Sequence, residues 1–253
     1  MLWVFDLDGV VWLSGQAIPG SAEAVRRLRG DGHRVAFVTN NSTPTVGEYV
    51  ERLARAGIEI DPGELASSSQ AAARLTEPGT RVACVGGEGV REALGQRGVE
   101  LVEVADRPAT VVVGRSLQLD FAELAAAARA IRDGARFVAT NTDSTFPTPH
   151  GPEPGAGALI AYLEVGSGAK AEAAGKPEQP MADLVQDRYG QPDVVVGDRA
   201  ETDGAFADRL GAPFALVLSG VTTRADLPVQ PEPAVVADDL AGAVAALLDR
   251  HAS

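Results

Sequence analysis

The chain of 253 residues can form one large or two modest domains, and its fractions of hydrophobic (45%) and charged (23%) residues are ordinary for a folded protein. A formal net charge of −13 at pH 7 argues against nucleic acid or an anionic membrane as a partner, because both are bound through basic surfaces. The single cysteine, Cys84, excludes an intramolecular disulfide and a cysteine-rich metal site. No apolar run reaches membrane-spanning length, and the first residues already predict a strand, so we expect a cytoplasmic protein without a signal peptide.

The first predicted element is a buried strand that ends in an acidic turn. Leu2-Trp3-Val4-Phe5 is apolar and is followed by Asp6, Asp8 and Gly9. Two carboxylates one residue apart concentrate negative charge, which attracts a hard divalent cation. An isolated Asp-x-Asp is more often a turn that closes a strand, so further motifs must decide between the two interpretations.

A second strand, over residues 34–38, follows a helix over residues 22–29 and ends on the hydroxyl and amide side chains of residues 39–43. We expect a helix from about 45 to 56, and then a further strand and helix between 58 and 75. Glu77-Pro78-Gly79-Thr80 is the first strong boundary signal. An inserted domain is therefore predicted to begin there.

The α/β alternation restarts after this boundary. Strands are predicted over 81–85, 99–104, 110–113 and 136–139, and helices at about 88–96, 121–132 and 156–163. The Pro- and Gly-rich segment 140–155 is predicted to be a long loop, which is typical of either a functional lid or a mobile segment. His150 lies in this loop, where a solvated histidine is more common than a catalytic one.

The small, flexible segment 165–175 is expected to return the chain to the first module. Lys176 opens a helix that runs to about residue 189, and the strand 193–196 ends on an acidic segment that contains Asp198 and Asp203. Short strands at 214–218 and 235–236 and a helix over 240–248 complete the chain. Because Lys170 and Lys176 are the only lysines among 22 Lys and Arg residues, each is a weak indication of a place where a compact charge matters.

Three predicted strands therefore end on polar side chains, namely Asp6 and Asp8, Thr39, and Asp198 with Asp203. Right-handed crossovers place such strand ends at one edge of a parallel sheet, where ligands bind. The ordered motifs Asp-Leu-Asp-Gly-Val, Ile-Pro-Gly, Thr-Asn-Asn-Ser, Gly-Lys-Pro-Glu and Gly-Asp-Arg-x-x-Thr-Asp resemble those of the haloacid dehalogenase (HAD) superfamily. They are most similar to subfamily IIA, which contains the NagD-like, p-nitrophenyl phosphatase-like and phosphoglycolate phosphatase-like enzymes.

The resemblance covers nearly the whole chain and implies an α/β fold with two parts. Residues 1–79 and 173–253 would form a Rossmann-like catalytic core with a parallel sheet, and residues 80–172 an inserted α/β cap of the C2 type. It also implies a Mg²⁺-dependent phosphatase acting on small phosphate monoesters. Because dehalogenases of the superfamily lack the second aspartate, the presence of Asp8 disfavours that activity.

Cleavage of a phosphate monoester needs a nucleophile, a proton source for the leaving oxygen and positive charge around the phosphoryl group. We assign Asp6 as the nucleophile that forms an aspartyl-phosphate, and Asp8 as the acid that protonates the leaving alcohol and then activates water. Mg²⁺ is expected to bridge Asp6, the backbone carbonyl of Asp8, and Asp198, because the carboxylate and the phosphate otherwise repel each other.

Further roles are expected for residues around these groups. Phosphoryl oxygens would be bound by Thr39, Asn40 and Lys176, with Asp203 and Asn41 in support, and the leaving group would face the cap residues Asn141, Asp143 and His150. In the cap, Asp143 would repel a strongly anionic substrate or accept hydrogen bonds from a polyol. A cap-mediated homodimer would require an exposed apolar cap patch.

Two other functions fit the same motifs. A phosphotransferase would pass the phosphoryl group from Asp6 to an alcohol instead of water. A catalytically quiet phosphometabolite-binding protein could use the same fold, although the intact set of motifs makes it the weaker hypothesis.

Overall fold

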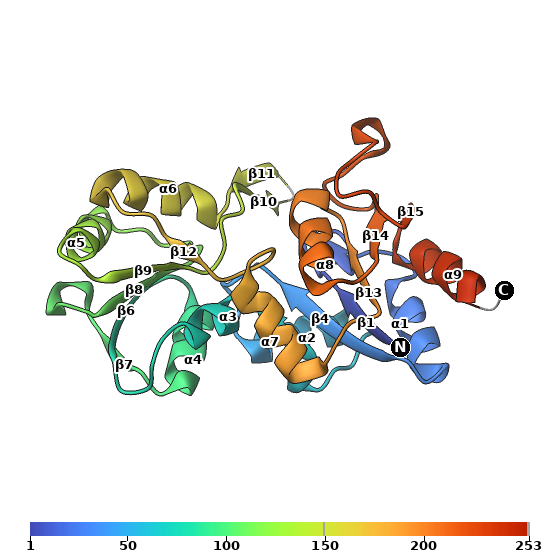
Figure 1. The fold of residues 1–253 in the computed structure, drawn as a ribbon, viewed down its shortest axis with the longest axis horizontal. Coiled ribbons are helices and arrows are strands. Elements are labelled where there is room, and N and C mark those ends of the chain that lie inside the picture. The colour runs from blue at the N-terminus through green and yellow to red at the C-terminus, as the bar shows by residue number, and fades with distance from the viewer. Residues whose placement is uncertain (149, 252–253) are drawn as a thin grey trace.

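The computed structural model describes residues 1–148 and 150–251, and its strands form two larger sheets and two small ribbons. Figure 1 shows the two larger sheets next to each other along the long axis of the molecule, each with helices packed against it. One sheet combines strands from both ends of the sequence, whereas the other takes all its strands from residues 81–173. We call them the core sheet and the insert sheet.

The core sheet is parallel and has six strands in the order β15-β14-β13-β1-β4-β5. Its strands are β1 (Leu2–Phe5), β4 (Arg34–Thr39), β5 (Leu65–Ser67), β13 (Val194–Gly197), β14 (Phe214–Val217) and β15 (Val235–Ala237). The central strand β1 pairs Phe5 with Phe37 of β4 and with Val196 of β13. These three neighbouring strands are the ones predicted to end on functional side chains, so their polar ends meet.

Both faces of the core sheet are covered, because successive side chains of β1 point to opposite sides. Trp3 and Phe5 belong to the apolar cluster of the helices α1 (Ser21–Gly30), α2 (Val46–Arg55) and α9 (Leu240–His251). Leu2 and Val4 belong to the cluster of α3 (Ser68–Arg74), α7 (Gln179–Tyr189) and α8 (Ala205–Leu210). This two-sided burial explains the continuous apolar runs in the sequence.

The insert sheet is also parallel and has the order β12-β9-β8-β6-β7. It contains β6 (Arg81–Val85), β7 (Glu100–Val102), β8 (Thr110–Val113), β9 (Arg136–Ala139) and β12 (Glu172–Ala173). One face packs against α5 (Phe121–Arg132) and α6 (Ala156–Ser167). The other face, with α4 (Glu88–Arg97), joins the apolar cluster that contains α3 and α7, so the insert shares a hydrophobic core with the first unit.

The segment 140–155 differs from its prediction as a structureless loop, because it contains an antiparallel hairpin. The hairpin consists of β10 (Thr145–Thr148) and β11 (Gly151–Pro154), and its register pairs Phe146 with Glu153 and Pro147 with Pro152. Prolines argue against a central strand, but an isolated two-stranded ribbon leaves free edges on which their missing N–H groups do no harm. The predicted helix end at residue 163 was also too early, since α6 continues to Ser167 and ends at Gly168 with φ 78°.

The remaining elements are short. A ribbon of β2 (Trp12–Leu13) and β3 (Gln16–Ala17) follows β1, and single turns of 3₁₀ helix cover Pro62–Glu64, Val104–Asp106 and Arg224–Asp226. A π-helical turn, Ala200–Gly204, leads directly into α8. Within the described ranges, the helices are too short and too polar to cross a lipid bilayer.

Candidate active site

The carboxyl ends of β13, β1 and β4 bring Asp198, Asp6 and Thr39 to one edge of the core sheet. Asp8 lies two residues after Asp6 in the turn that follows β1, where Gly9 has a φ of 84°. A side chain on Gly9 would overlap the Asp198 carboxylate, so glycine is required by both backbone conformation and space. The carboxylate of Asp8 accepts a hydrogen bond of 3.0 Å from the Trp12 indole N–H.

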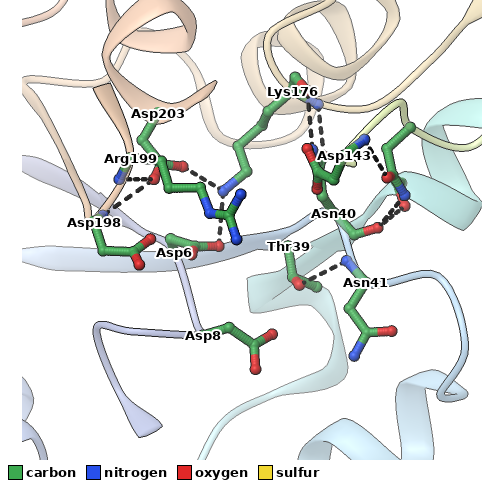
Figure 2. A network of polar contacts seen from close by, with 12 residues as sticks. Asp6, Asp8, Thr39, Asn40, Asn41, Asp143, Lys176, Asp198, Arg199 and Asp203 are labelled. Atoms are coloured by element: carbon green, nitrogen blue, oxygen red, sulfur yellow. Dashed lines mark hydrogen bonds and ion pairs between the residues drawn. The ribbon is translucent and has the colours of Figure 1, made fainter. Parts of the chain in front are cut away.

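Lys176 is the buried cation of this edge, with 4% of its surface exposed. Its Nζ lies 2.7 Å from Oδ1 of Asp6 and 2.6 Å from Oδ1 of Asp203 (Figure 2). Burial by itself lowers the pKa of Lys176, but the charges of Asp203 and Asp6 outweigh burial and raise that pKa above its ordinary value. Lys176 is therefore held as a permanent positive charge against the predicted nucleophile.

Asp203 supports the site through both of its carboxylate oxygens. Oδ1 accepts from Lys176, and Oδ2 accepts from the backbone N–H groups of Asp198 and Arg199 at 3.1 Å each. The π-helical turn Ala200–Gly204 carries Asp203 back over the end of β13 to make these contacts. A side chain at Gly197 would occupy the place of the Asp203 carboxylate, which explains the glycine at the end of β13.

Carboxylate oxygens of Asp6, Asp198 and Asp203 lie within 4.8 Å of one another. Burial raises the pKa of Asp6 well above its ordinary range, and burial together with the charge of Asp203 raises the pKa of Asp198 to about 7. Lys176 alone does not offset this concentration of buried negative charge. Since both oxygens of Asp203 are engaged, Asp6 and Asp198 are the carboxylates left to hold a hard divalent cation such as Mg²⁺, and the donor set fits it.

Asn40 joins three segments of the chain. Its Nδ2 donates to both carboxylate oxygens of Asp143, at 3.2 and 3.1 Å, and to the backbone carbonyl of Lys176 at 2.9 Å. Its Oδ1 accepts from the N–H of Lys176 at 2.7 Å. The side chain of Asn40 is thus fully used as a connector, which leaves its backbone N–H for the predicted contact with phosphate. The hydroxyl of Thr39 accepts from the N–H of Asn41 at 3.1 Å.

The three predicted cap residues differ in burial and in their position relative to the site. Asn141 is buried and donates to the carbonyl of Asn40 at 2.7 Å, so its amide serves the framework of the site. Asp143 faces the site, where burial raises its pKa and the hydrogen bond from Asn40 opposes that rise. His150 is exposed at the end of the hairpin β10–β11 and is not among the residues that line the site.

Two adjoining cavities lie at this edge. The inner cavity, about 50 Å³, is lined by the predicted site residues, among them Asp6, Asp8, Thr39, Asn40, Asn41, Asp143, Lys176, Asp198 and Asp203. The outer cavity, about 400 Å³, is lined by Asp8, Trp12, Ser14, Gly15, Ala17, Asn41, Arg52, Arg55, Ala56, Phe146, Pro147 and Thr148. The two cavities share Asp8, Asn41, Phe146 and Pro147. The predicted acid therefore stands at their junction.

Arg115 holds the hairpin β10–β11 over both cavities. Its guanidinium lies 4.3 Å from the centre of the Phe146 ring and 3.1 Å from the carboxylate of Glu153, which is paired with Phe146 across the hairpin. The backbone carbonyl of Arg115 accepts from the hydroxyl of Thr43, at 3.3 Å, in the loop after β4. Sequence reasoning missed Arg115 and the hairpin, because no local pattern marks a contact between residues so far apart.

Comparisons with known proteins cover most of the chain. A family model described as haloacid dehalogenase-like hydrolase matches residues 3–100, and one described as HAD-hydrolase-like matches residues 173–243. The chain is 37% identical over 231 residues to the D-glycerol 3-phosphate phosphatase of Mycobacterium tuberculosis. That alignment covers 88% of this chain and 64% of the relative, so the chain spans about two thirds of that protein.

Two solved structures are similar over nearly the whole chain. The p-nitrophenyl phosphatase from Archaeoglobus fulgidus superposes with a TM-score of 0.90 at 34% identity, over 97% of this chain and 98% of that one. A glycerol phosphate phosphatase from Mycobacterium tuberculosis in complex with magnesium gives a TM-score of 0.88 at 34% identity, over 96% of this chain and 75% of that one.

Proposed function

The chain belongs to the haloacid dehalogenase-like hydrolase family, and we propose that it is a Mg²⁺-dependent phosphatase that hydrolyses small phosphate monoesters through a phosphorylated Asp6. The observation that carries this proposal is the contact of Asp6 with the buried Lys176, at 2.7 Å, beside Asp198 and at the floor of a small polar cavity. The similar proteins described above are phosphatases, and one of them is a complex with magnesium.

Asp6 is the nucleophile of the proposed reaction. A carboxylate oxygen of Asp6 forms a bond to phosphorus while the bond from phosphorus to the leaving oxygen breaks, which gives an aspartyl-phosphate. Lys176 offsets part of the negative charge that gathers at this point. Asp6, Asp198 and the backbone carbonyl of Asp8 would hold Mg²⁺, which would supply the further positive charge needed for a carboxylate to approach a phosphate dianion.

Asp8 acts as the general acid and then as the general base of the proposed reaction. Burial raises its pKa, which favours the protonated form that can donate to the leaving alkoxide. The hydrogen bond from Trp12 holds the carboxyl group at the junction of the cavities. Once Asp8 has lost its proton, it accepts one from the water that attacks phosphorus in the aspartyl-phosphate. The bond between phosphorus and Asp6 breaks, which releases phosphate and regenerates the Asp6 carboxylate and the protonated Asp8.

The other site residues bind the phosphoryl group or position the residues that do so. Thr39, the backbone N–H of Asn40, and Lys176 bind phosphoryl oxygens, while Asp203 fixes both Lys176 and the loop of Asp198. We propose residues 1–79 and 173–253 as the catalytic core and residues 80–172 as the cap, with β12 (Glu172–Ala173) crossing the second boundary. The hairpin β10–β11 of the cap covers the site. Since His150 does not line either cavity, the specificity role first expected for it is not part of the proposal.

The cytoplasmic location and the homodimer expected from the sequence stay predictions. The exposed apolar side chains between residues 80 and 172 that could serve a cap-mediated contact include Leu117, Leu119 and Phe121, which are 73%, 55% and 73% exposed near the start of α5.

The test is phosphate release from a panel of phosphomonoesters by the natural chain and by Asp6→Asn, each with Mg²⁺ and with EDTA. We expect release only from the natural chain with Mg²⁺, while calorimetry still detects Mg²⁺ binding to the variant. Release that survives in Asp6→Asn would contradict the covalent route. Phosphate transfer to an added alcohol in place of release would identify a phosphotransferase, and no reaction across the panel would favour a binding protein.

A further inference from the structure

The outer cavity has a positively charged wall. Its charged lining residues are Asp8, at the junction with the inner cavity, and Arg52 and Arg55 of α2. Residues three apart on a helix lie on the same side, so the two guanidinium groups reach the cavity from one helical surface. The charged lining of this cavity is therefore positive on balance, whereas the chain as a whole has a net charge of −13.

Neither arginine forms an ion pair with a carboxylate in the described part of the chain, although the charge of Arg52 acts on the Asp8 carboxylate and lowers its pKa. Arg52 makes no side-chain hydrogen bond or ion pair there, and its guanidinium lies 6.0 Å from the centre of the Tyr49 ring. Arg55 donates only from Nε, to the backbone carbonyl of Glu51 at 3.3 Å. Both side chains are exposed and retain most of their donors for a ligand.

The order of the two cavities decides which part of a substrate would meet these arginines. The phosphoryl group belongs in the inner cavity, beside Asp6 and Lys176. Asp8 must reach the oxygen that leaves, and it lines both cavities. The leaving alcohol therefore extends past Asp8 into the outer cavity, whose volume of about 400 Å³ suits a small molecule.

We propose that the leaving alcohol of the substrate carries a second anionic group, a carboxylate or another phosphate, and that Arg52 together with Arg55 binds it. This inference rests on the proposed phosphatase function. A guanidinium offers several N–H donors in a planar fork that matches both anions. Arg52 and Arg55 are thus specificity-determining residues in the core unit, in addition to any selection made by the cap.

The sequence left two roles open for Asp143, repulsion of a strongly anionic substrate or acceptance of hydrogen bonds from a polyol, and the first of these would oppose the present proposal. Asp143 lines the inner cavity but not the outer one, and its two oxygens accept from Asn40. The Asp143 carboxylate therefore bonds Asn40 and does not face the outer cavity, into which the leaving group extends.

The test compares three esters of the same chain length: 2-hydroxyethyl phosphate, which has a neutral leaving group, phosphoglycolate, which has a carboxylate, and ethane-1,2-diyl bisphosphate. The quantity measured is the ratio of kcat/KM for each anionic ester to kcat/KM for the neutral one. Arg52→Gln and Arg55→Gln are compared with the natural chain. Arg27→Gln, on the exposed surface of α1 and outside both cavities, is the matched control.

We expect the natural chain and Arg27→Gln to prefer one of the anionic esters. In Arg52→Gln the preference falls by about tenfold or more, mainly through KM, because a charge-assisted contact is lost. Arg52→Lys, which keeps the charge, retains part of the preference. The ester with the higher kcat/KM shows whether the second anionic group of the natural substrate is a carboxylate or a phosphate.

A natural chain that prefers 2-hydroxyethyl phosphate, or a ratio that is the same in Arg52→Gln and Arg27→Gln, would overturn the inference while leaving the phosphatase proposal intact. If no ester is hydrolysed and p-nitrophenyl phosphate is also inert, the proposed function itself fails. Circular dichroism of each variant identifies a change caused by misfolding.

Discussion

Replacing Lys176 with methionine removes the buried cation of the site and leaves its carboxylates behind. The side chain of Lys176 is 3% exposed, and its Nζ holds Asp6 and Asp203 at 2.7 and 2.6 Å. Breaking a buried ion pair by removing one partner costs about 3–5 kcal/mol, because the remaining charge is not compensated. We therefore expect Lys176→Met to lower the free energy of unfolding by about 3–5 kcal/mol at pH 8 in EDTA.

The loss should depend on pH, and its sign follows from the pKa of Asp6. Burial already raises that pKa well above its ordinary value, and loss of Lys176 raises it further. A carboxyl group with a raised pKa in the folded state stabilises the fold when protonated, and this contribution is lost as pH rises. The deficit of Lys176→Met should thus be smaller at pH 5 than at pH 8.

The assay is urea unfolding followed by circular dichroism, and the second lysine of the chain provides the control. Lys170 lies 2.6 Å from Glu164, but its side chain is 87% exposed. Exposed ion pairs contribute at most about 1 kcal/mol, so Lys170→Met should lose no more than that. If the two variants lose the same stability, or if the deficit of Lys176→Met is independent of pH, the reasoning about the buried charges is refuted.

Three further outcomes are expected. Arg115→Leu should raise KM about fivefold, since its contact with the Phe146 ring contributes about 1 kcal/mol to placing the hairpin; an unchanged KM in steady-state kinetics would contradict this. Cys84, whose pKa burial raises to about 12, should resist a thiol reagent at pH 8 until urea unfolds the chain, as counted by mass spectrometry. Gly89→Ala should lower stability by about 1–3 kcal/mol in urea unfolding, because its methyl group would overlap the Pro44 carbonyl.

The strands and the residues at their ends could be predicted because they depend on local pattern and on one rule of topology. An apolar run followed by Asp6 or Thr39 is visible in the sequence, and parallel pairing then brings the two ends together. The family resemblance and the α/β fold were confirmed by the comparisons. The catalytic roles and the limits of the cap stay predictions.

What the sequence did not reveal depends on contacts between distant segments. Nothing near Arg115 indicates that it will pack on the Phe146 ring, and Pro147 hides the hairpin that carries this ring. The charged wall of the outer cavity was missed for a related reason. Arg52 and Arg55 look like ordinary solvent-facing residues of an amphipathic helix until the hairpin is placed opposite them.

The pairing of β1 with β13 also has a consequence for the order in which the chain folds during synthesis. Trp3 is paired with Val194, so the centre of the core sheet cannot close until most of the chain has left the ribosome. All strands of the insert sheet come from residues 81–173 and can associate earlier. β1 can pair with β4 early, but its other neighbour, β13, is made nearly two hundred residues later, so one edge of the strand that carries the nucleophile stays open during most of synthesis.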